Sequence, residues 1–198
     1  DPPMAHHAKK DPPRTTADLR LDIEEQSEEL ASLFHATEDA ELVQRPPSGK
    51  WSAVEHVDHL AKVNRGYLDA LESAVASGRA AGRSGAGPFR GSVLGRFFAA
   101  SMEPPVKMKV KTLAAMQPDS ELAPEPTLAV FQDLQERLVA LLREAEGLDL
   151  DAIRVASPFM KLLRAPAFSW FVVLTAHNRR HIWLIRQTLT DLDRAKRG

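Results

Sequence analysis

The sequence predicts an all-α fold, a bundle of four long helices. Apolar residues recur at every third or fourth position in four separate segments, which is the pattern of a helix that buries one face. No segment shows the alternation of apolar and polar residues that predicts strands. Clusters of proline and glycine separate the four segments, and a chain of 198 residues suits one domain with a substantial core.

The first helix is expected to begin at Thr15 or Thr16, either of which can cap its amino end. Its apolar stripe consists of Leu19, Ile23, Leu30, Leu33 and Phe34. We expect it to end near residues 37–42, before the helix-breaking prolines and glycine of residues 45–49. Residues 1–14, which hold four prolines, are expected to form a flexible N-terminal tail.

The second helix has a clear start signal. Ser52 is followed three residues later by Glu55, which is a capping box, and Trp51 stands where a hydrophobic staple would pack. Its apolar stripe predicts a helix that continues to about Ser77. His56 and His59 both fall in the first two turns of this helix, so it can supply a metal ligand.

A long, partly mobile connection is expected over residues 78–126. Its glycines do not predict a phosphate-binding loop, because no Gly-Lys-Ser/Thr follows them at the required spacing. The third helix is predicted to begin at Thr127 and to stop at Gly147. The four-helix domain is expected over residues 15–192, followed by a C-terminal tail at residues 193–198.

The fourth helix carries two histidines one turn apart. His177 and His181 lie within residues 168–192, a run without Gly or Pro, so both side chains share one helix face. Two neutral imidazoles at this spacing can bind one metal ion at roughly 2.0–2.1 Å, and they need one or two further ligands. A protease of the His-Glu-x-x-His type is disfavoured, because Asn178 occupies the position of its glutamate base.

Composition excludes several classes of protein. The formal net charge of −1 gives no overall attraction to nucleic acid or to an anionic membrane. The chain has no cysteine, so disulfides, thiolate ligands and a cysteine nucleophile are excluded. No apolar run approaches the roughly 20 residues of a membrane span, and no signal peptide is evident, so a cytoplasmic location is expected.

Two motifs resemble a known family. Residues 51–60 read Trp-Ser-Ala-Val-Glu-His-Val-Asp-His-Leu, which is similar to the Trp-Ser-x-x-Glu-x-x-x-His-Leu opening of the second helix in the DinB/YfiT-like superfamily. His177, Arg180 and His181, followed six residues later by Gln187, resemble that family's last helix. The two motifs stand in the expected order near both ends of a four-helix plan.

This resemblance implies an up-down-down-up four-helix bundle, commonly a homodimer, that holds one divalent metal ion. The implied ligands are His59, His177 and His181. Imidazole suits zinc, nickel, copper and iron, so the ion stays open, with zinc, nickel or iron expected. His56 could compete as a ligand, whereas Glu55 is already explained by its capping role. Asp58 or Asn64 could orient an imidazole from outside the ligand set.

Three histidines leave a coordination position open, which is typical of a catalytic site. The leading hypothesis is a metal-dependent S-transferase in which a low-molecular-weight thiol attacks a small electrophile, since the superfamily includes such enzymes. A hydrolase that activates water at the metal is the alternative. A third hypothesis is a non-enzymatic dimeric metal-binding or stress-response protein. No catalytic residue beyond the ligands is identified.

Overall fold

The computed structural model of the chain describes residues 15–106, 112–160 and 162–197. The expected N-terminal tail, residues 1–14, lies outside the described residues. Four long helices dominate the described part of the chain: α1 (Thr16–His35), α3 (Ala53–Ala80), α5 (Pro124–Glu144) and α6 (Ala167–Arg197). The prediction of an all-α bundle is therefore confirmed.

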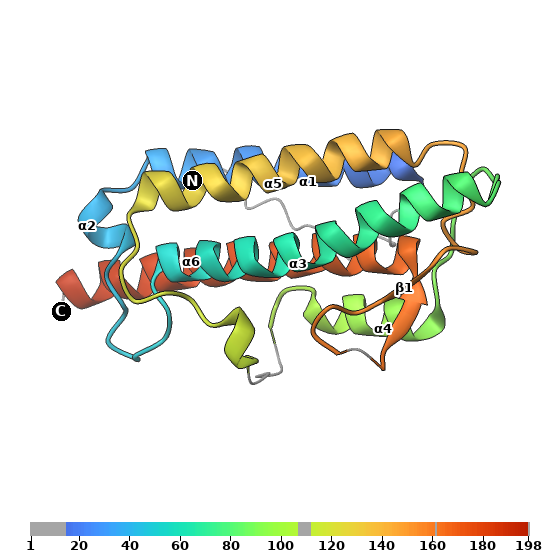
Figure 1. Cartoon of the computed structure of the whole chain (residues 1–198). Helices are drawn as coiled ribbons and strands as arrows, with labels where there is room; N and C mark the ends of the chain where they lie inside the picture. Colours follow the sequence, from blue (N-terminus) through green and yellow to red (C-terminus); the bar gives the residue numbers. More distant parts are fainter. Residues whose placement is uncertain (1–14, 107–111, 161, 198) are drawn as a thin grey trace.

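The four long helices form two layers, with α1 and α5 in one layer and α3 and α6 in the other (Figure 1). Followed from its amino end, α1 runs in the same direction as α6, whereas α3 and α5 both run in the opposite direction (Figure 1). Each of the four long helices packs against two of the others, since α5 contacts α1 and α3, and α6 contacts α3 and α1. This is the up-down-down-up arrangement that the resemblance implied.

Several smaller elements join the long helices: α2 (Asp39–Leu42), α4 (Val93–Met102), the 3-10 helix η1 (Ala114–Met116), β1 (Arg154–Ala156) and β2 (Arg164–Pro166). The two strands form a small antiparallel hairpin between α5 and α6. These two strands left no sign in the sequence, because strands of three residues are too short to produce a recognisable alternation.

Local signals place most of the helix ends. Both predicted amino-terminal caps are present, as capping boxes that pair Thr15 with Asp18 and Ser52 with Glu55. The first helix ends at His35, earlier than expected, and α2 forms separately. Here the Thr37 hydroxyl donates to the Leu33 carbonyl at 2.8 Å, which replaces a helical amide as that carbonyl's partner.

The last two long helices have ends that differ from those the sequence suggested. The α5 helix begins at Pro124 rather than Thr127, because proline is well suited to the first helical turn. It ends at Glu144, and Gly147 lies in the following turn with a φ of +80°. Residues 193–197 continue α6 rather than forming a separate tail, since no glycine or proline interrupts the helix before residue 198.

The connection over residues 78–126 has more structure than expected. Its first residues extend α3, and α4 packs against α6 outside the bundle. Ser92 caps α4 by accepting from the Gly95 amide at 3.0 Å. A β-carbon at Gly95 would lie 2.7 Å from the Ser169 Cβ, so only glycine permits this close approach of α4 to α6. The α4 part of the connection is thereby held against the last helix.

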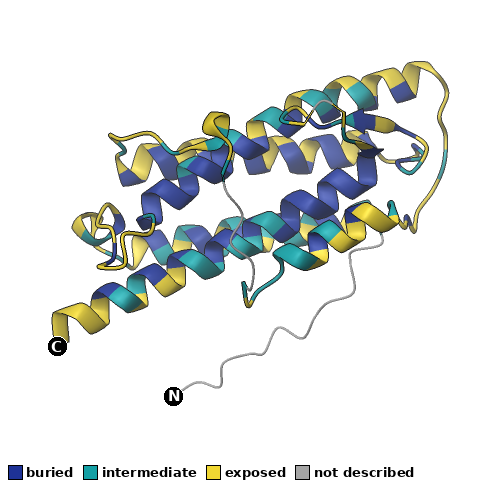
Figure 2. Cartoon of the chain, turned by 90° about the horizontal axis from the view of Figure 1, so that it is seen from below, coloured by how far each residue is buried: buried dark blue, intermediate teal, exposed yellow. Residues whose placement is uncertain are grey.

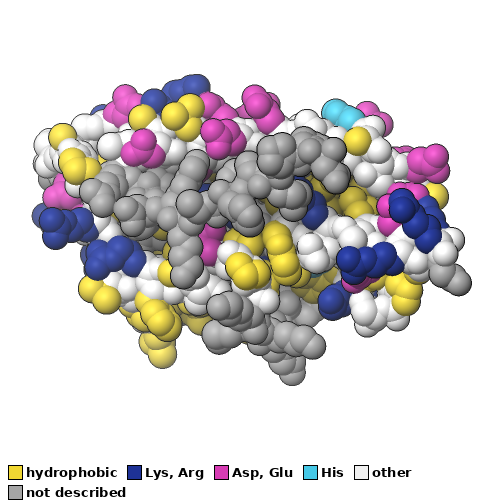
Figure 3. All heavy atoms as spheres, turned by 180° about the vertical axis from the view of Figure 1, so that it is seen from behind, with side chains coloured by type: hydrophobic (Ala, Val, Ile, Leu, Met, Phe, Trp, Pro, Cys, Tyr) yellow, Lys and Arg dark blue, Asp and Glu magenta, His cyan; other side chains and the backbone are white. Residues whose placement is uncertain are grey.

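Buried side chains line the inward faces of the long helices, whereas the carboxyl end of α6 is exposed (Figure 2). The largest fully buried side chains include Phe131, Phe168 and Phe171. Acidic and basic side chains both occur on the face shown in Figure 3, in keeping with the net charge of −1. Among the described residues, no helix combines the length and apolar character that crossing a membrane requires.

Candidate metal centre

Three histidines from two helices converge inside the bundle. His59 comes from the first turns of α3, and His177 and His181 lie one turn apart on α6. One ring nitrogen from each histidine can be chosen so that the three atoms lie within 4.8 Å of one another. His59 and His181 are buried and His177 is half-buried. The structure thus brings together the three residues that the family resemblance implied as ligands.

The spacing of the ring nitrogens fits a shared metal ion. The Nε2 atoms of His59 and His177 lie 3.3 Å apart. Two nitrogens bound to one tetrahedral zinc ion at about 2.0–2.1 Å would be separated by about 3.3–3.4 Å. The described groups that could hold an ion contain no cysteine or carboxylate alongside these histidines, so the donor set is imidazole only.

A backbone carbonyl orients His59. Its Nδ1–H donates to the carbonyl oxygen of Met116 at 2.7 Å, and a carbonyl can only accept. The proton of neutral His59 is therefore on Nδ1, which leaves the lone pair of Nε2 facing His177. Met116 ends η1, in the connection over residues 78–126. Sequence reasoning missed this contact, because a backbone carbonyl leaves no signal in the sequence.

His56 also reaches the centre, but outside the group of three. Its Nδ1 lies 2.9 Å from the Nδ1 of His181. The sequence left open whether His56 competes as a ligand, and in the structure it is a hydrogen-bond partner of His181. The spacing of His56 and His59 put both residues near the same face, but only the packing of α3 against α6 shows which ring nitrogen His56 contacts.

Trp51 packs against three of the four histidines. Its ring centroid lies 5.4 Å from His56, 5.1 Å from His59 and 6.3 Å from His181. The Trp51 carbonyl accepts from the Thr188 hydroxyl at 3.2 Å, which ties this residue to α6. The predicted staple is present, since Trp51 precedes the cap residue and contacts the fourth residue of α3.

Burial favours the neutral form of all four imidazoles. It lowers the pKa of His56 from 6.5 to about 3, with a further contribution from the charge of His59. Burial also lowers the pKa of His59, although the hydrogen bond to the Met116 carbonyl opposes the shift. The pKa values of His177 and His181 fall well below 6.5, because both rings are desolvated and close to other histidines. Neutral imidazole is the form that binds metal.

Glu55 does not take part in the centre. Its carboxylate accepts from the Ser52 amide at 2.8 Å and forms an ion pair with Arg45. Burial raises the pKa of Glu55, but the hydrogen bonds from Arg45 and Ser52 outweigh it and lower the pKa. The capping role preferred from the sequence is the one observed.

Neither of the other two suggested orienting residues contacts an imidazole. Asp58 accepts from the Asp119 amide at 2.9 Å and pairs with Lys62. The Asn64 amide donates to Asn178 at 3.2 Å, in a fully buried polar contact between α3 and α6. The structure gives both residues other hydrogen-bond partners, and which partner each meets depends on how α3 packs against its neighbours.

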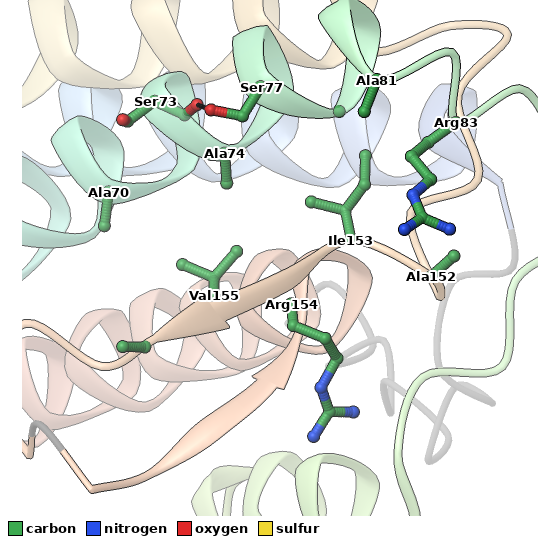
Figure 4. A pocket seen from close by; sticks show the side chains of 12 residues that line it. Ala70, Ser73, Ala74, Ser77, Ala81, Arg83, Ala152, Ile153, Arg154 and Val155 are labelled. Atoms are coloured by element: carbon green, nitrogen blue, oxygen red, sulfur yellow. Dashed lines mark hydrogen bonds between the residues drawn. The ribbon is translucent and has the colours of Figure 1, made fainter.

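A pocket of about 530 Å³ lies elsewhere in the molecule, between α3 and β1 (Figure 4). Ala74 projects from α3 toward the strand that carries Val155, and Ser77 also lines the pocket (Figure 4). Ser77 follows His59 by 18 residues, which corresponds to roughly 27 Å along the helix. The nearest lining residue on α3, Ala70, follows His59 by 11 residues, which corresponds to roughly 16–17 Å along the helix, and no described histidine lines this pocket.

Comparisons with known proteins agree with this architecture. Of the solved structures, YfiT from Bacillus subtilis, described as a probable metal-dependent hydrolase with an unusual four-helix bundle topology, matches with a TM-score of 0.58. The match covers 94% of this chain and 92% of YfiT at 17% sequence identity, which supports a shared fold. No curated protein sequence matches the chain. The sequence model of the DinB superfamily matches residues 22–185, and the chain accordingly belongs to that superfamily.

Proposed function

We propose that this chain is a divalent-metal-dependent enzyme that acts on a small molecule, with His59, His177 and His181 as the ligands of one ion. The observation that carries the proposal is the convergence of three neutral imidazole nitrogens within 4.8 Å. Three protein ligands leave a coordination position open, as catalytic rather than structural sites do. A bound divalent ion would supply a Lewis acid that polarises a substrate and lowers the pKa of a bound water or thiol.

Hydrolysis is the reaction that we put first. The structural neighbour YfiT is described as a probable metal-dependent hydrolase, and its fold extends over almost the whole of this chain. The protein's own residues hold two of the three imidazoles, since the Met116 carbonyl orients His59 and the Trp51 ring packs against His59 and His181. These contacts fix both ligands before a substrate arrives, so little reorganisation is needed when it binds.

Thiol transfer to a small electrophile is the second candidate. Two carboxylates close in sequence to His59 are already engaged, since Glu55 pairs with Arg45 and Asp58 pairs with Lys62. Neither is available as a general base for water. A thiol is more acidic than water and depends less on such a base. Because the chain has no cysteine, the thiol would have to be a separate molecule.

Metal content is the first test of the proposed centre. Elemental mass spectrometry would compare the parent with His59→Gln and His181→Gln variants, all carrying serine at positions 6 and 7 so that the terminal histidines cannot bind ions. His35→Gln is the matched control, because His35 is exposed at the end of α1. We expect about one ion per chain in the parent and the control, and loss of the ion in both variants. A metal-free parent after incubation with zinc, nickel or iron would refute the proposal.

Turnover assays separate the two reactions. Chromogenic esters would be followed with and without added thiol, and a chromogenic electrophile would be followed with a low-molecular-weight thiol. Metal-dependent ester cleavage without thiol supports the hydrolase, and conjugation that needs both metal and thiol supports the transferase. If metal binding raises the melting temperature but neither reaction is found across a broad substrate panel, the non-enzymatic metal-binding protein is favoured.

A homodimer and a cytoplasmic location are further parts of the proposal. Light scattering of the purified chain would test the first, and a mass of one chain across micromolar concentrations would contradict it. Fractionation of cells that express the full-length protein would test the second.

A further inference from the structure

We infer that His56 is a positioning residue for the metal centre, acting through a hydrogen bond that it accepts from the Nδ1–H of His181. This inference rests on the proposed function, because His181 has to be a ligand for the bond to matter. It goes beyond the three-histidine set, since it gives a fourth buried histidine a defined task.

The contact between the two rings fixes where their protons are. The Nδ1 atoms of His56 and His181 lie 2.9 Å apart, so one must donate and the other must accept. Each side chain is only 5% exposed, and so water does not compete for the contact. If His181 offers Nε2 to the ion, its proton is on Nδ1. His56 then accepts at Nδ1 and carries its own proton on Nε2.

The ligand on α3, His59, is oriented by a hydrogen bond of the same kind. His59 donates from Nδ1 to the Met116 carbonyl at 2.7 Å, which directs its Nε2 lone pair toward the centre. His56 accepts the Nδ1–H of His181 just as this carbonyl accepts the Nδ1–H of His59. Partners of this kind hold a ligating imidazole in the required tautomer and ring orientation, and their loss typically weakens metal binding about 10–100-fold.

His56 is itself held in place by its surroundings. It is the fourth residue of α3, directly after Glu55, whose carboxylate closes the capping box with Ser52. The Trp51 ring packs edge-on against the His56 ring at a centroid distance of 5.4 Å. The capped first turn and this ring contact restrict His56 to the position from which it reaches His181.

His56 is not well placed to be a fourth ligand. The group whose nitrogens lie within 4.8 Å of one another consists of His59, His177 and His181. An imidazole that accepts a hydrogen bond at Nδ1 has its proton on Nε2, and so neither nitrogen retains a free lone pair. Binding an ion through His56 would break the contact with His181.

Two substitutions test the inference. His56→Asn keeps an acceptor oxygen near the position of Nδ1, whereas His56→Leu removes the acceptor at a similar size. Zinc affinity would be measured by competition with a chromophoric chelator, using full-length parent, both variants and the exposed-site control His35→Asn. We expect about 10–100-fold weaker zinc binding for His56→Leu, and less than about 3-fold change for His56→Asn and for the control.

Two further readouts distinguish positioning from ligation or from a purely structural role. The visible spectrum of the Co²⁺-loaded His56→Asn variant should match that of the parent, because the ligand set is unchanged. Two-bond ¹H–¹⁵N NMR of the metal-free protein should show His181 protonated on Nδ1 in the parent and in His56→Asn, and this preference should be lost in His56→Leu. Circular dichroism would confirm that each variant is folded.

Several results would overturn the inference. If His56→Leu keeps the parent's zinc affinity, or if His56→Asn loses as much affinity as His56→Leu, positioning through an acceptor is excluded. A changed Co²⁺ spectrum in His56→Asn would make His56 a ligand instead. If the parent binds neither zinc nor nickel nor iron, the proposed function fails together with this inference. If the parent binds zinc and only the variants behave unexpectedly, the inference alone fails.

Discussion

The buried histidines should make the metal-free protein sensitive to mild acid. His56 is only 5% exposed, and burial lowers its pKa from 6.5 to about 3. In the unfolded chain this imidazole takes up a proton near pH 6.5, whereas in the folded chain it stays neutral until far lower pH. The unfolded state therefore binds more protons below pH 6.5, and the free energy of unfolding falls as the pH falls from 6.5 toward 3.

The size of this loss of stability follows from how far the pH lies below 6.5, the pKa of the unfolded imidazole. A pH of 5 is about 1.5 units below the pKa of the unfolded imidazole, and each unit corresponds to about 1.4 kcal/mol. His56 alone therefore lowers the free energy of unfolding at pH 5 by about 2 kcal/mol. The pKa values of His59, His177 and His181 are lowered in the same direction. Their effects add to that of His56, so the total loss should exceed 2 kcal/mol.

Urea unfolding in the presence of a chelator provides the assay. The free energy of unfolding would be measured at pH 7.5 and pH 5.0 for the parent, for His56→Leu and for the exposed-site control His35→Gln. The stability lost between the two pH values should be about 2 kcal/mol smaller in His56→Leu than in the parent. The control should lose as much as the parent, because the substitution at the end of α1 leaves the four histidines of the centre unchanged.

Two outcomes would refute this reasoning. If the parent is as stable at pH 5.0 as at pH 7.5, the buried imidazoles are not held neutral by the fold. If the stability of His56→Leu depends on pH as that of the parent does, His56 is protonated to the same extent in the folded and the unfolded chain. Comparing stability differences within each variant removes the effect of the substitution on stability at pH 7.5.

Four further predictions concern stability. Gly78→Ala should cost about 1–3 kcal/mol in urea unfolding, because a β-carbon there would lie 2.4 Å from the Ile153 Cδ1; an unchanged midpoint would contradict this packing. Ser52→Ala removes the cap of α3 and should cost about 1 kcal/mol, and a cost below about 0.3 kcal/mol would show that the cap is dispensable. Arg179→Met should cost about 1 kcal/mol in low salt and less in high salt, since the Arg179–Glu103 pair is partly solvent-exposed; salt-independent loss would point to packing instead. Removing the metal from saturated protein with a chelator should lower the melting temperature by about 5–10 °C, as expected for a ligand present at roughly 100 times its Kd, and no shift would argue against a bound ion.

Interactions between residues close in the chain were evident in the sequence. The capping box of Ser52 and Glu55 spans three residues, and His177 and His181 are four residues apart, so helix geometry alone places each pair. The apolar stripes predicted which faces of the long helices are buried. The breaks between helices followed from proline and glycine, which restrict or release the backbone locally.

Interactions between distant residues depended on the tertiary structure. His59 and His177 are separated by 118 positions, and only the docking of α3 against α6 brings their Nε2 atoms to 3.3 Å. The resemblance to a family anticipated this pair, but periodicity could not. The hydrogen bond from His59 to the Met116 carbonyl and the contact of His56 with His181 had no counterpart in the sequence pattern. A sequence specifies which residues share a helix face, because that depends on local backbone geometry. Which ring nitrogen meets which partner depends on the relative position and rotation of two packed helices, which is settled only when the whole core forms.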